Sequence, residues 1–112
     1  MLSKETLNDE ILKEIASVGG GYGRKIEYCM EKIKRIKRAL YYLEKRLKRE
    51  KGKIPKLSIK LSVSLRKKMK LYKEEAFKYR YYLIIYRESI GLTNHRAVYE
   101  IYNIEKVLEN DP

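Results

Sequence analysis

The sequence has little of the chemistry that enzymes and metal sites require. In 112 residues there is one cysteine, Cys29, one histidine, His95, and no tryptophan. One cysteine excludes an intrachain disulfide, and a single cysteine with a single histidine falls short of a structural zinc site. Aspartate occurs only as Asp9 and Asp111, and no nucleophile with a neighbouring base stands out. We therefore expect no catalysis, no cofactor and no metal.

Long apolar runs are also missing. No stretch approaches the roughly 20 apolar residues that cross a bilayer. The first residues, MLSKETLNDE, lack the basic and apolar regions of a secretory signal. We expect a soluble, cytoplasmic protein, and a membrane is a disfavoured partner. Apolar residues make up 44% of the chain, which is enough for one helical domain over 1–112. The abundance of charged residues resembles the composition of hyperthermophile proteins.

The charges are segregated along the chain. Residues 1–23 carry a net charge of −2 and residues 88–112 a net charge of −3, whereas residues 24–87 carry +17, for a total of +12. Within 45–70 there are twelve Lys or Arg and one acid, Glu50. A solvated surface normally mixes both signs. The excess in the middle of the chain therefore indicates a polyanionic partner.

A short acidic helix is predicted at the start, over 1–18, with Leu7, Ile11 and Ile15 on one face. Glycine frees the backbone for turns, so the following GGGYGRK (19–25) is predicted to end this helix and form a flexible connection. It lacks the spacing of a phosphate-binding P-loop.

Residues 24–90 are predicted to form a basic, antiparallel, coiled-coil-like helical hairpin. Apolar residues alternate at three and four positions over 24–50 and again over 65–90, the a/d pattern that joins two helices. We call these positions the seam. The first helix contributes Ile26, Cys29, Ile33, Ile36, Leu40, Leu43 and Leu47. The second contributes Leu65, Met69, Tyr72, Ala76, Tyr79, Leu83, Tyr86 and Ile90.

Matching the ends of the two long helices predicts which residues face one another. Ile26 is then near Ile90 and Leu47 near Met69. The same register places Arg46 opposite Lys68, and Lys51 opposite Arg66, so that like charges face each other.

Gly91 is predicted to stop the second long helix. A last, acidic helix is predicted over 93–108, with Thr93 or Asn94 as its cap and with Val98, Ile101 and Tyr102 facing inward. Both acidic end helices are predicted to pack near the base of the hairpin. Phe77, Tyr81, Ile84 and Ile85 lie off the seam, and they require cover from these helices or from a partner chain.

The stretch KIPKLSIKLSVSLRKKMK (53–70) fits two structures. Leu57 to Leu65 alternate as in a strand, but Leu57, Leu61, Leu65 and Met69 also recur every four residues. A strand here would need a second copy of the chain to satisfy its backbone groups. We favour a helix that begins near Pro55, or a helix preceded by an ordered loop.

The strongest functional signal is the basic end of the hairpin. Lys and Arg bind phosphates, the start of a helix offers free amides to an anion, and Tyr stacks on bases. We predict non-enzymatic binding of RNA or DNA with low sequence specificity. The predicted nucleic-acid-binding residues are Arg38, Tyr41, Tyr42, Lys45, Arg46, Lys48, Arg49, Lys51, Lys53, Lys56, Lys60, Arg66, Lys67, Lys68 and Lys70.

Other interpretations remain open. Tyr41 and Tyr42 are as well suited to packing on another helix as to stacking on a base. The heptad pattern also suits a structural protein, either a homodimer or a subunit of a larger helical assembly. A helix-turn-helix over 88–102, with Asn94, His95 and Arg96 as base contacts, is disfavoured because Glu100 and Glu105 would repel phosphates.

Overall fold

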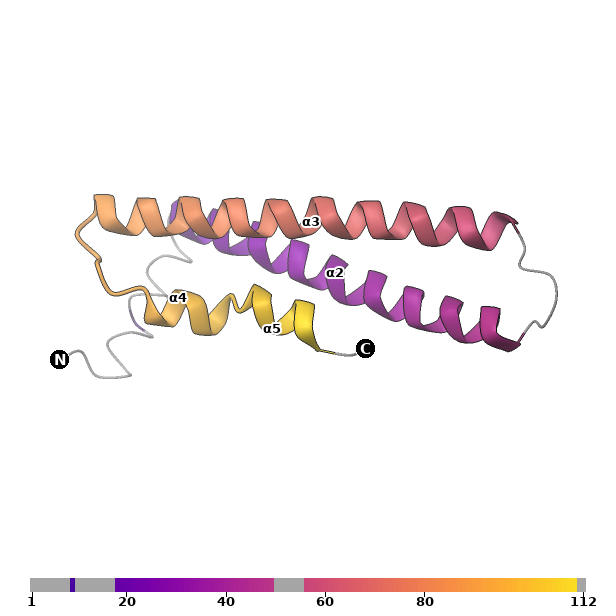
Figure 1. Ribbon diagram of the computed structural model, residues 1–112. Helices are drawn as coiled ribbons and strands as arrows, with labels where there is room; N and C mark the ends of the chain where they lie inside the picture. The colour runs from indigo at the N-terminus through magenta and orange to yellow at the C-terminus, as the bar shows by residue number, and fades with distance from the viewer. Residues whose placement is uncertain (1–8, 10–17, 50–55, 111–112) are drawn as a thin grey trace.

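The described residues of the computed structural model, 9, 18–49 and 56–110, fold almost entirely as α-helix (Figure 1). The helices with described bounds are α2 (Val18–Arg49), α3 (Lys56–Ser89), α4 (Arg96–Ile101) and α5 (Ile104–Glu109), and these residues include no strand. This confirms the all-helical class, with two long helices packed together and short helices at the C-terminal end. The helix predicted over 1–18 lies almost wholly outside the described residues.

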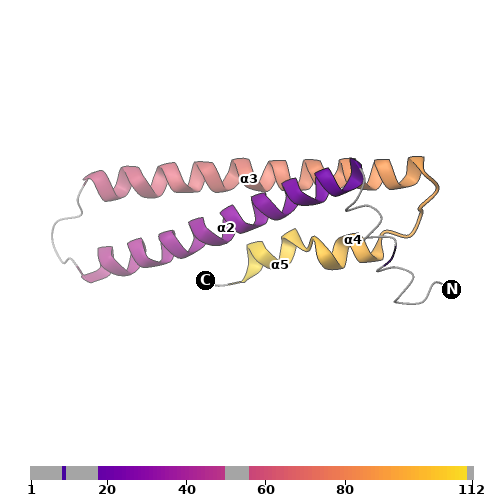
Figure 2. The same ribbon diagram turned by 180° about the vertical axis from the view of Figure 1, so that it is seen from behind.

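Contacts between α2 and α3 run in opposite order along the two helices. Near the start of α2, the rings of Tyr22 and Tyr82 are 6.0 Å apart. Near its end, Arg66 Nη2 donates a hydrogen bond of 2.7 Å to Glu44 Oε1. Figure 2 shows the two helices side by side from behind.

The register of these contacts differs from the prediction. Lys25 lies over the ring of Tyr79, 4.9 Å from its centroid, so its neighbour Ile26 is far from its predicted partner Ile90. Arg66 pairs with the acid Glu44, and its predicted neighbour Lys51 lies outside the described residues. The error follows from matching the ends of the seam ranges, 24–50 and 65–90, and not the ends of the whole helices. Because α2 begins six residues earlier and α3 nine residues earlier, matched ends give a different register.

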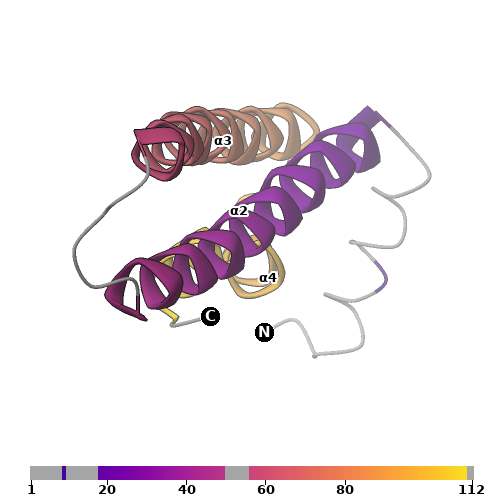
Figure 3. The same cartoon turned by 90° about the vertical axis from the view of Figure 1, so that its right-hand side faces the viewer.

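The seam is best buried in the half of the molecule that also holds α4 and α5. Ile26, Ile33 and Leu83 have at most 1% of their surface exposed. Towards the other end, where α2 stops at Arg49 and α3 starts at Lys56, Leu47 and Leu65 are only half-buried. The two helices diverge in that direction, as Figures 1 and 3 show. The seam is therefore sealed beside α4 and α5, at the end we call the base, and is open at the opposite end, the tip.

The glycine-rich stretch does not end a helix, contrary to prediction. Residues 19–23 form the first turns of α2. Tyr102, which is buried, lies so close to this turn that a Cβ at Gly23 would overlap its hydroxyl and would be 3.0 Å from its Cζ. Glycine lets the aromatic ring approach the helix backbone directly. Here it serves close packing between α2 and the C-terminal segment.

Gly91 ends α3 as predicted. Its φ of 90° is left-handed, and the amides of Gly91 and Leu92 donate to the carbonyls of Glu88 (3.1 Å) and Arg87 (2.9 Å). These two bonds form the Schellman arrangement that closes a helix at glycine. Arg87 is fully buried beside this turn and donates through Nη2 to the carbonyl of Asn94 at 3.0 Å. The guanidinium thus holds the connection to α4.

The last predicted helix, 93–108, is interrupted. A continuous helix would join the amide of Lys106 to the carbonyl of Tyr102. Instead Asn103 Oδ1 accepts from the Lys106 amide (3.1 Å), and Arg80 donates to the Tyr102 carbonyl (3.1 Å). These competing partners split the segment into α4 and α5. Val98 and Tyr102 face inward as predicted, whereas Ile101 is exposed.

Two cations of the long helices fasten α4 and α5 to the base. Lys37 on α2 donates to the carbonyls of Val107 (3.0 Å) and Leu108 (2.9 Å) at the end of α5. Arg80 on α3, nearly buried, donates to Glu105 Oε2 at 2.8 Å. This guanidinium holds the pKa of Glu105 at about 2, down from 4.5. A positive side chain at the carbonyl end of a helix is favourable, and a paired buried cation avoids the cost of desolvation.

The start of α3 settles the structure of the ambiguous stretch. Residues 56–64 are helical, so the strand interpretation is wrong and the favoured helix is confirmed over this range. Their apolar side chains point in several directions around the helix. Leu57, Ile59, Leu61 and Val63 remain exposed, Leu57 by 78%. None of the described helices has a stretch apolar enough and long enough to span a membrane.

Candidate nucleic-acid interface

The predicted nucleic-acid-binding residues that the structure describes are all exposed, and they occupy the half of each long helix that leads to Arg49 or Lys56, the end of the pair that faces the viewer in Figure 3. On α2 they are Arg38, Tyr41, Tyr42, Lys45, Arg46, Lys48 and Arg49, and on α3 they are Lys56, Lys60, Arg66, Lys67, Lys68 and Lys70. We call this set the basic tip. Lys51 and Lys53 lie outside the described residues.

The α2 part of the basic tip combines aromatic rings with cations. Tyr41 and Tyr42 meet edge to face, with centroids 5.6 Å apart, and Tyr42 is 67% exposed. Lys45 Nζ lies 4.6 Å from the Tyr41 centroid. A hydrogen bond to the Tyr41 hydroxyl raises the pKa of Lys45, so the ammonium stays charged. Within the described chain these rings are exposed, a position from which they can stack on a base.

The α3 part of the basic tip carries its charge at a helix start. The first turn holds Lys56 and no acid, and between Lys56 and Lys73 there is no acidic residue. The free amides and the dipole of a helix start attract anions and disfavour cations. An arrangement that repels its own charges is stabilised when a polyanion binds. Arg66 is the partial exception, because its exposed ion pair with Glu44 offsets some charge.

The residues of the disfavoured helix-turn-helix are engaged inside the connection between α3 and α4. His95 Nε2 is 3.1 Å from Glu88 Oε1, and Arg96 Nε is 2.9 Å from Glu100 Oε1. Asn94 Oδ1 accepts from the Arg96 amide at 3.1 Å. The helix that follows, α4, spans only six residues. These contacts point to a structural role for the connection.

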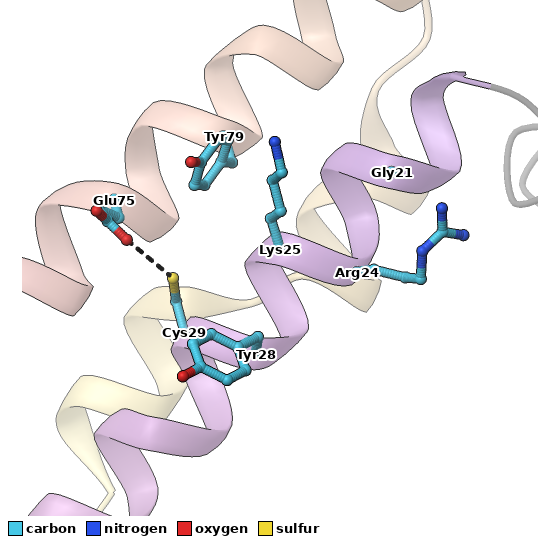
Figure 4. Close-up of a pocket in the computed structure, with 7 residues that line it drawn as sticks. All are labelled: Gly21, Arg24, Lys25, Tyr28, Cys29, Glu75 and Tyr79. Carbon is cyan, nitrogen blue, oxygen red and sulfur yellow. Dashed lines mark hydrogen bonds between the residues drawn. The ribbon is translucent and has the colours of Figure 1, made fainter.

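Sequence reasoning missed a pocket on the flank of the α2–α3 pair that faces away from α4 and α5. The pocket has a volume of about 440 Å³ and lies between the first turns of α2 and the middle of α3 (Figure 4). Its lining includes Gly21, Arg24, Lys25, Tyr28, Glu75 and Tyr79. Tyr79 was predicted to be core, yet it is only half-buried at the edge of the seam. Lys25, Tyr28 and Lys32 recur at three and four positions, and this spacing was the sequence signal that could have pointed to a shared face here.

Ring contacts join the two long helices along this flank, which we call the tyrosine flank. Tyr28 meets Tyr72 at 6.2 Å, and Tyr82 meets both Tyr22 (6.0 Å) and Tyr79 (6.4 Å). Partial burial and a hydrogen bond with Tyr28 raise the pKa of Tyr72. Tyr81, which was predicted to require cover, is exposed, and so is its neighbour Tyr82.

Cys29 borders the pocket but is not suited to nucleophilic chemistry. It is buried on the seam, and its Sγ lies 3.9 Å from Glu75 Oε2. Burial and the neighbouring carboxylate raise the pKa of the thiol, which therefore stays protonated. The part of the chain that the structure describes holds no group of three or more metal-ligating side chains.

Comparisons with known protein families, with curated proteins and with solved structures find no match for this chain.

Proposed function

We propose that the chain is an antiparallel helical hairpin that binds nucleic acid through phosphate contacts at the basic tip, without catalysis and with low sequence specificity. One observation carries the proposal. The predicted cations that the structure describes are all exposed, and they lie on the halves of α2 and α3 that lead to Arg49 and Lys56, where the two helices diverge. Lys and Arg that neutralise phosphates release counterions, which favours binding to any nucleic-acid sequence. The reversed order of the α2–α3 contacts supports the hairpin.

The exposed tyrosines on α2 extend this proposal from charge to stacking. Tyr41 and Tyr42 stand among the cations of the last turns of α2, where a strand held by its phosphates would place bases or sugars. Every base has a face that stacks, so these contacts add affinity without adding sequence preference.

A salt series with labelled RNA and DNA tests the function. The logarithm of the binding constant should fall linearly with the logarithm of salt concentration, with a slope of about −0.9 for each phosphate contacted in duplex DNA. Absence of binding at low salt would refute the proposal. Duplexes and single strands, compared side by side, tell whether backbone shape or stacking dominates.

A charge-matched pair of variants locates the interface. Lys67→Gln with Lys68→Gln removes two exposed cations from the basic tip and leaves the Arg66–Glu44 ion pair in place. We expect the salt slope to decrease by about two and the affinity at 0.1 M salt to fall on the order of tenfold or more. The control, Arg96→Gln with Lys106→Gln, removes two exposed cations near the base. Equal losses in both variants would show that net charge alone acts.

A second candidate function is that of a structural subunit in a helical homo-oligomer or a larger assembly. It is favoured by the exposed apolar side chains Leu57, Ile59, Leu61 and Val63 at the start of α3. In that case the chain should elute as a dimer or larger species, measured by light scattering across protein concentrations. Leu57→Ser with Leu61→Ser should then return it to a monomer. A wild-type chain that is monomeric at high concentration would eliminate this candidate.

A further inference from the structure

The pocket on the tyrosine flank has the size and the lining of a site for one nucleotide. A volume of about 440 Å³ lies at the lower end of the range for small-molecule sites. Figure 4 shows its parts: the ring of Tyr79 on α3 and that of Tyr28 on α2 at opposite edges, the Cys29–Glu75 contact at one end, and Arg24 at the other. Aromatic, acidic and cationic groups are thus distributed in distinct places around the pocket.

The aromatic edges of the pocket are held in place before any ligand arrives. Tyr28, more than half exposed, is braced edge-on by Tyr72 at 71°. Tyr79 is flanked by Lys25 and Lys78, each 4.9 Å from its centroid. Rings fixed in advance lose little freedom when they bind, and a flat base stacks on them whatever its identity. Because two ammonium groups lie over the Tyr79 ring, the more exposed Tyr28 is the ring that can stack on an unpaired base, and Tyr79 with its lysines forms a positively charged edge.

The acidic end of the pocket provides selection among bases. Glu75 Oε2 accepts from the Cys29 thiol over a long 3.9 Å contact, and the carboxylate is exposed, with capacity for further donors. An ionised carboxylate only accepts hydrogen bonds. Guanine offers two adjacent donors on its pairing edge, the ring imino group and the 2-amino group, whereas each other base offers only one donor group there. A carboxylate in this position favours guanine.

The cationic end of the pocket provides for a phosphate. Arg24 is exposed at the rim, whereas Lys25, also exposed, extends from α2 towards the ring of Tyr79. The backbone at Gly21 is accessible to a ligand. A Cβ built there would meet only one atom within 4 Å, Arg24 Nη2 at 3.9 Å. Arg24 also shares one face of α2 with Arg38 and Lys45 of the basic tip, since these positions are 14 and 21 residues away. At 1.5 Å per residue, Lys45 is about 32 Å from Arg24, a distance that a strand of several nucleotides spans.

We propose that this pocket receives one unpaired guanine from a strand whose backbone lies along α2 towards the basic tip. The inference rests on the proposed nucleic-acid binding. It adds a single base-reading site, at the base of the hairpin, to a surface that otherwise reads charge and shape.

The test uses single-stranded oligonucleotides of equal length that contain one guanine, one inosine or one adenine in an otherwise uniform pyrimidine strand. Inosine lacks only the 2-amino group. We expect the guanine strand to bind the full-length protein about tenfold more tightly than the inosine strand, a discrimination typical of a paired hydrogen bond to a base. Glu75→Gln should abolish this ratio, since an amide cannot accept both donors. Glu74→Gln, which changes the adjacent exposed carboxylate, should preserve it.

A second variant tests the stacking independently. Tyr28→Ala truncates an exposed ring, so the fold survives, and far-ultraviolet circular dichroism confirms this. It should weaken the guanine strand several-fold while leaving the salt slope unchanged, because no phosphate contact is lost. If all strands bind equally well whatever base they contain, the proposal of a guanine site is refuted while the proposed function stands. A Glu75→Gln variant that still prefers guanine would have the same meaning. Absence of all binding at low salt would overturn both.

Discussion

The base and the tip of the α2–α3 pair have the same seam pattern, but their seam residues differ in how deeply they are buried. At the base, Leu83 is buried between the long helices beneath α4 and α5. At the tip, Leu65 stands on the same face of the same helix, eighteen residues or five turns earlier, and is only half-buried. Two helices alone cannot enclose a core, because each buries only one stripe. The heptad pattern specifies which side faces inward, and a third layer decides whether that side is sealed.

The base, which α4 and α5 cover, and the tip, which they do not, also differ in how their cations are placed. At the base, Arg80 and Arg87 are buried, and each makes hydrogen bonds to the C-terminal segment. At the tip, the cations point to solvent, and Arg66 has an exposed ion pair with Glu44. Buried cations demand fixed partners, whereas exposed cations stay available for a ligand. Positive charge thus stabilises the fold at one end and, in our proposal, binds nucleic acid at the other.

The sharpest test of the comparison is one substitution made at both ends. Leu83→Ala should lower the free energy of unfolding by about 2–5 kcal/mol, the usual cost of a cavity in a sealed core. Leu65→Ala, on the same face at the tip, should lower it by only about 1 kcal/mol, since its side chain is already partly solvated. Denaturant titration measures both values. Equal losses would mean that the tip is as well packed as the base.

The close approach at Gly23 offers a second test, with Gly21 as its control. Gly23→Ala should destabilise the protein by about 1–3 kcal/mol, because the new methyl group overlaps the buried Tyr102. Gly21→Ala meets only Arg24 Nη2, at an ordinary contact distance of 3.9 Å, and should stabilise the helix by up to about 1 kcal/mol. Adding Tyr102→Phe to Gly23→Ala removes the overlapping oxygen and should recover part of the loss in a double-mutant cycle. Two alanines with the same effect would exclude this close packing.

The ion pair that fastens α5 gives a smaller, pH-dependent effect. Because the pKa of Glu105 falls from 4.5 to about 2, its contribution to stability is complete above pH 4.5 and is lost as the pH falls towards 2. At about 1.4 kcal/mol per pKa unit this amounts to about 3 kcal/mol, which solvent screening of the half-exposed carboxylate reduces to about 1–2 kcal/mol.

Glu105→Gln should therefore lose about 1–2 kcal/mol at pH 7 and show a smaller further loss between pH 4.5 and 2 than the wild type. Thermal unfolding at several pH values measures the difference. Glu100→Gln, which breaks the exposed pair with Arg96, should change stability by only a few tenths of a kcal/mol. A wild type and a Glu105→Gln variant with the same acid transition would disprove the role of the pair.

Local sequence patterns were sufficient to predict several features of this protein. The three-and-four spacing of Ile26, Cys29 and Ile33 identified the inner face of α2, and all three residues are buried. Gly91 marked the end of α3, because only glycine adopts the left-handed turn without strain. The exposure of the basic residues followed from the cost of burying unpaired charge. Each of these depends on neighbours along one helix or on solvent alone.

Contacts between distant segments decided the rest. The glycines at 19–23 are compatible with a turn or a helix, and the ring of Tyr102 explains why glycine is needed inside α2. The break between α4 and α5 depends on Arg80, which takes the carbonyl that a continuous helix would use. The register of the seam, and with it the pocket beside Tyr28 and Tyr79, depends on where both long helices begin. The sequence by itself determined which faces are apolar and which are charged, because that follows from helical periodicity. The tertiary structure decided which of those faces meet, because their partners lie tens of residues away along the chain.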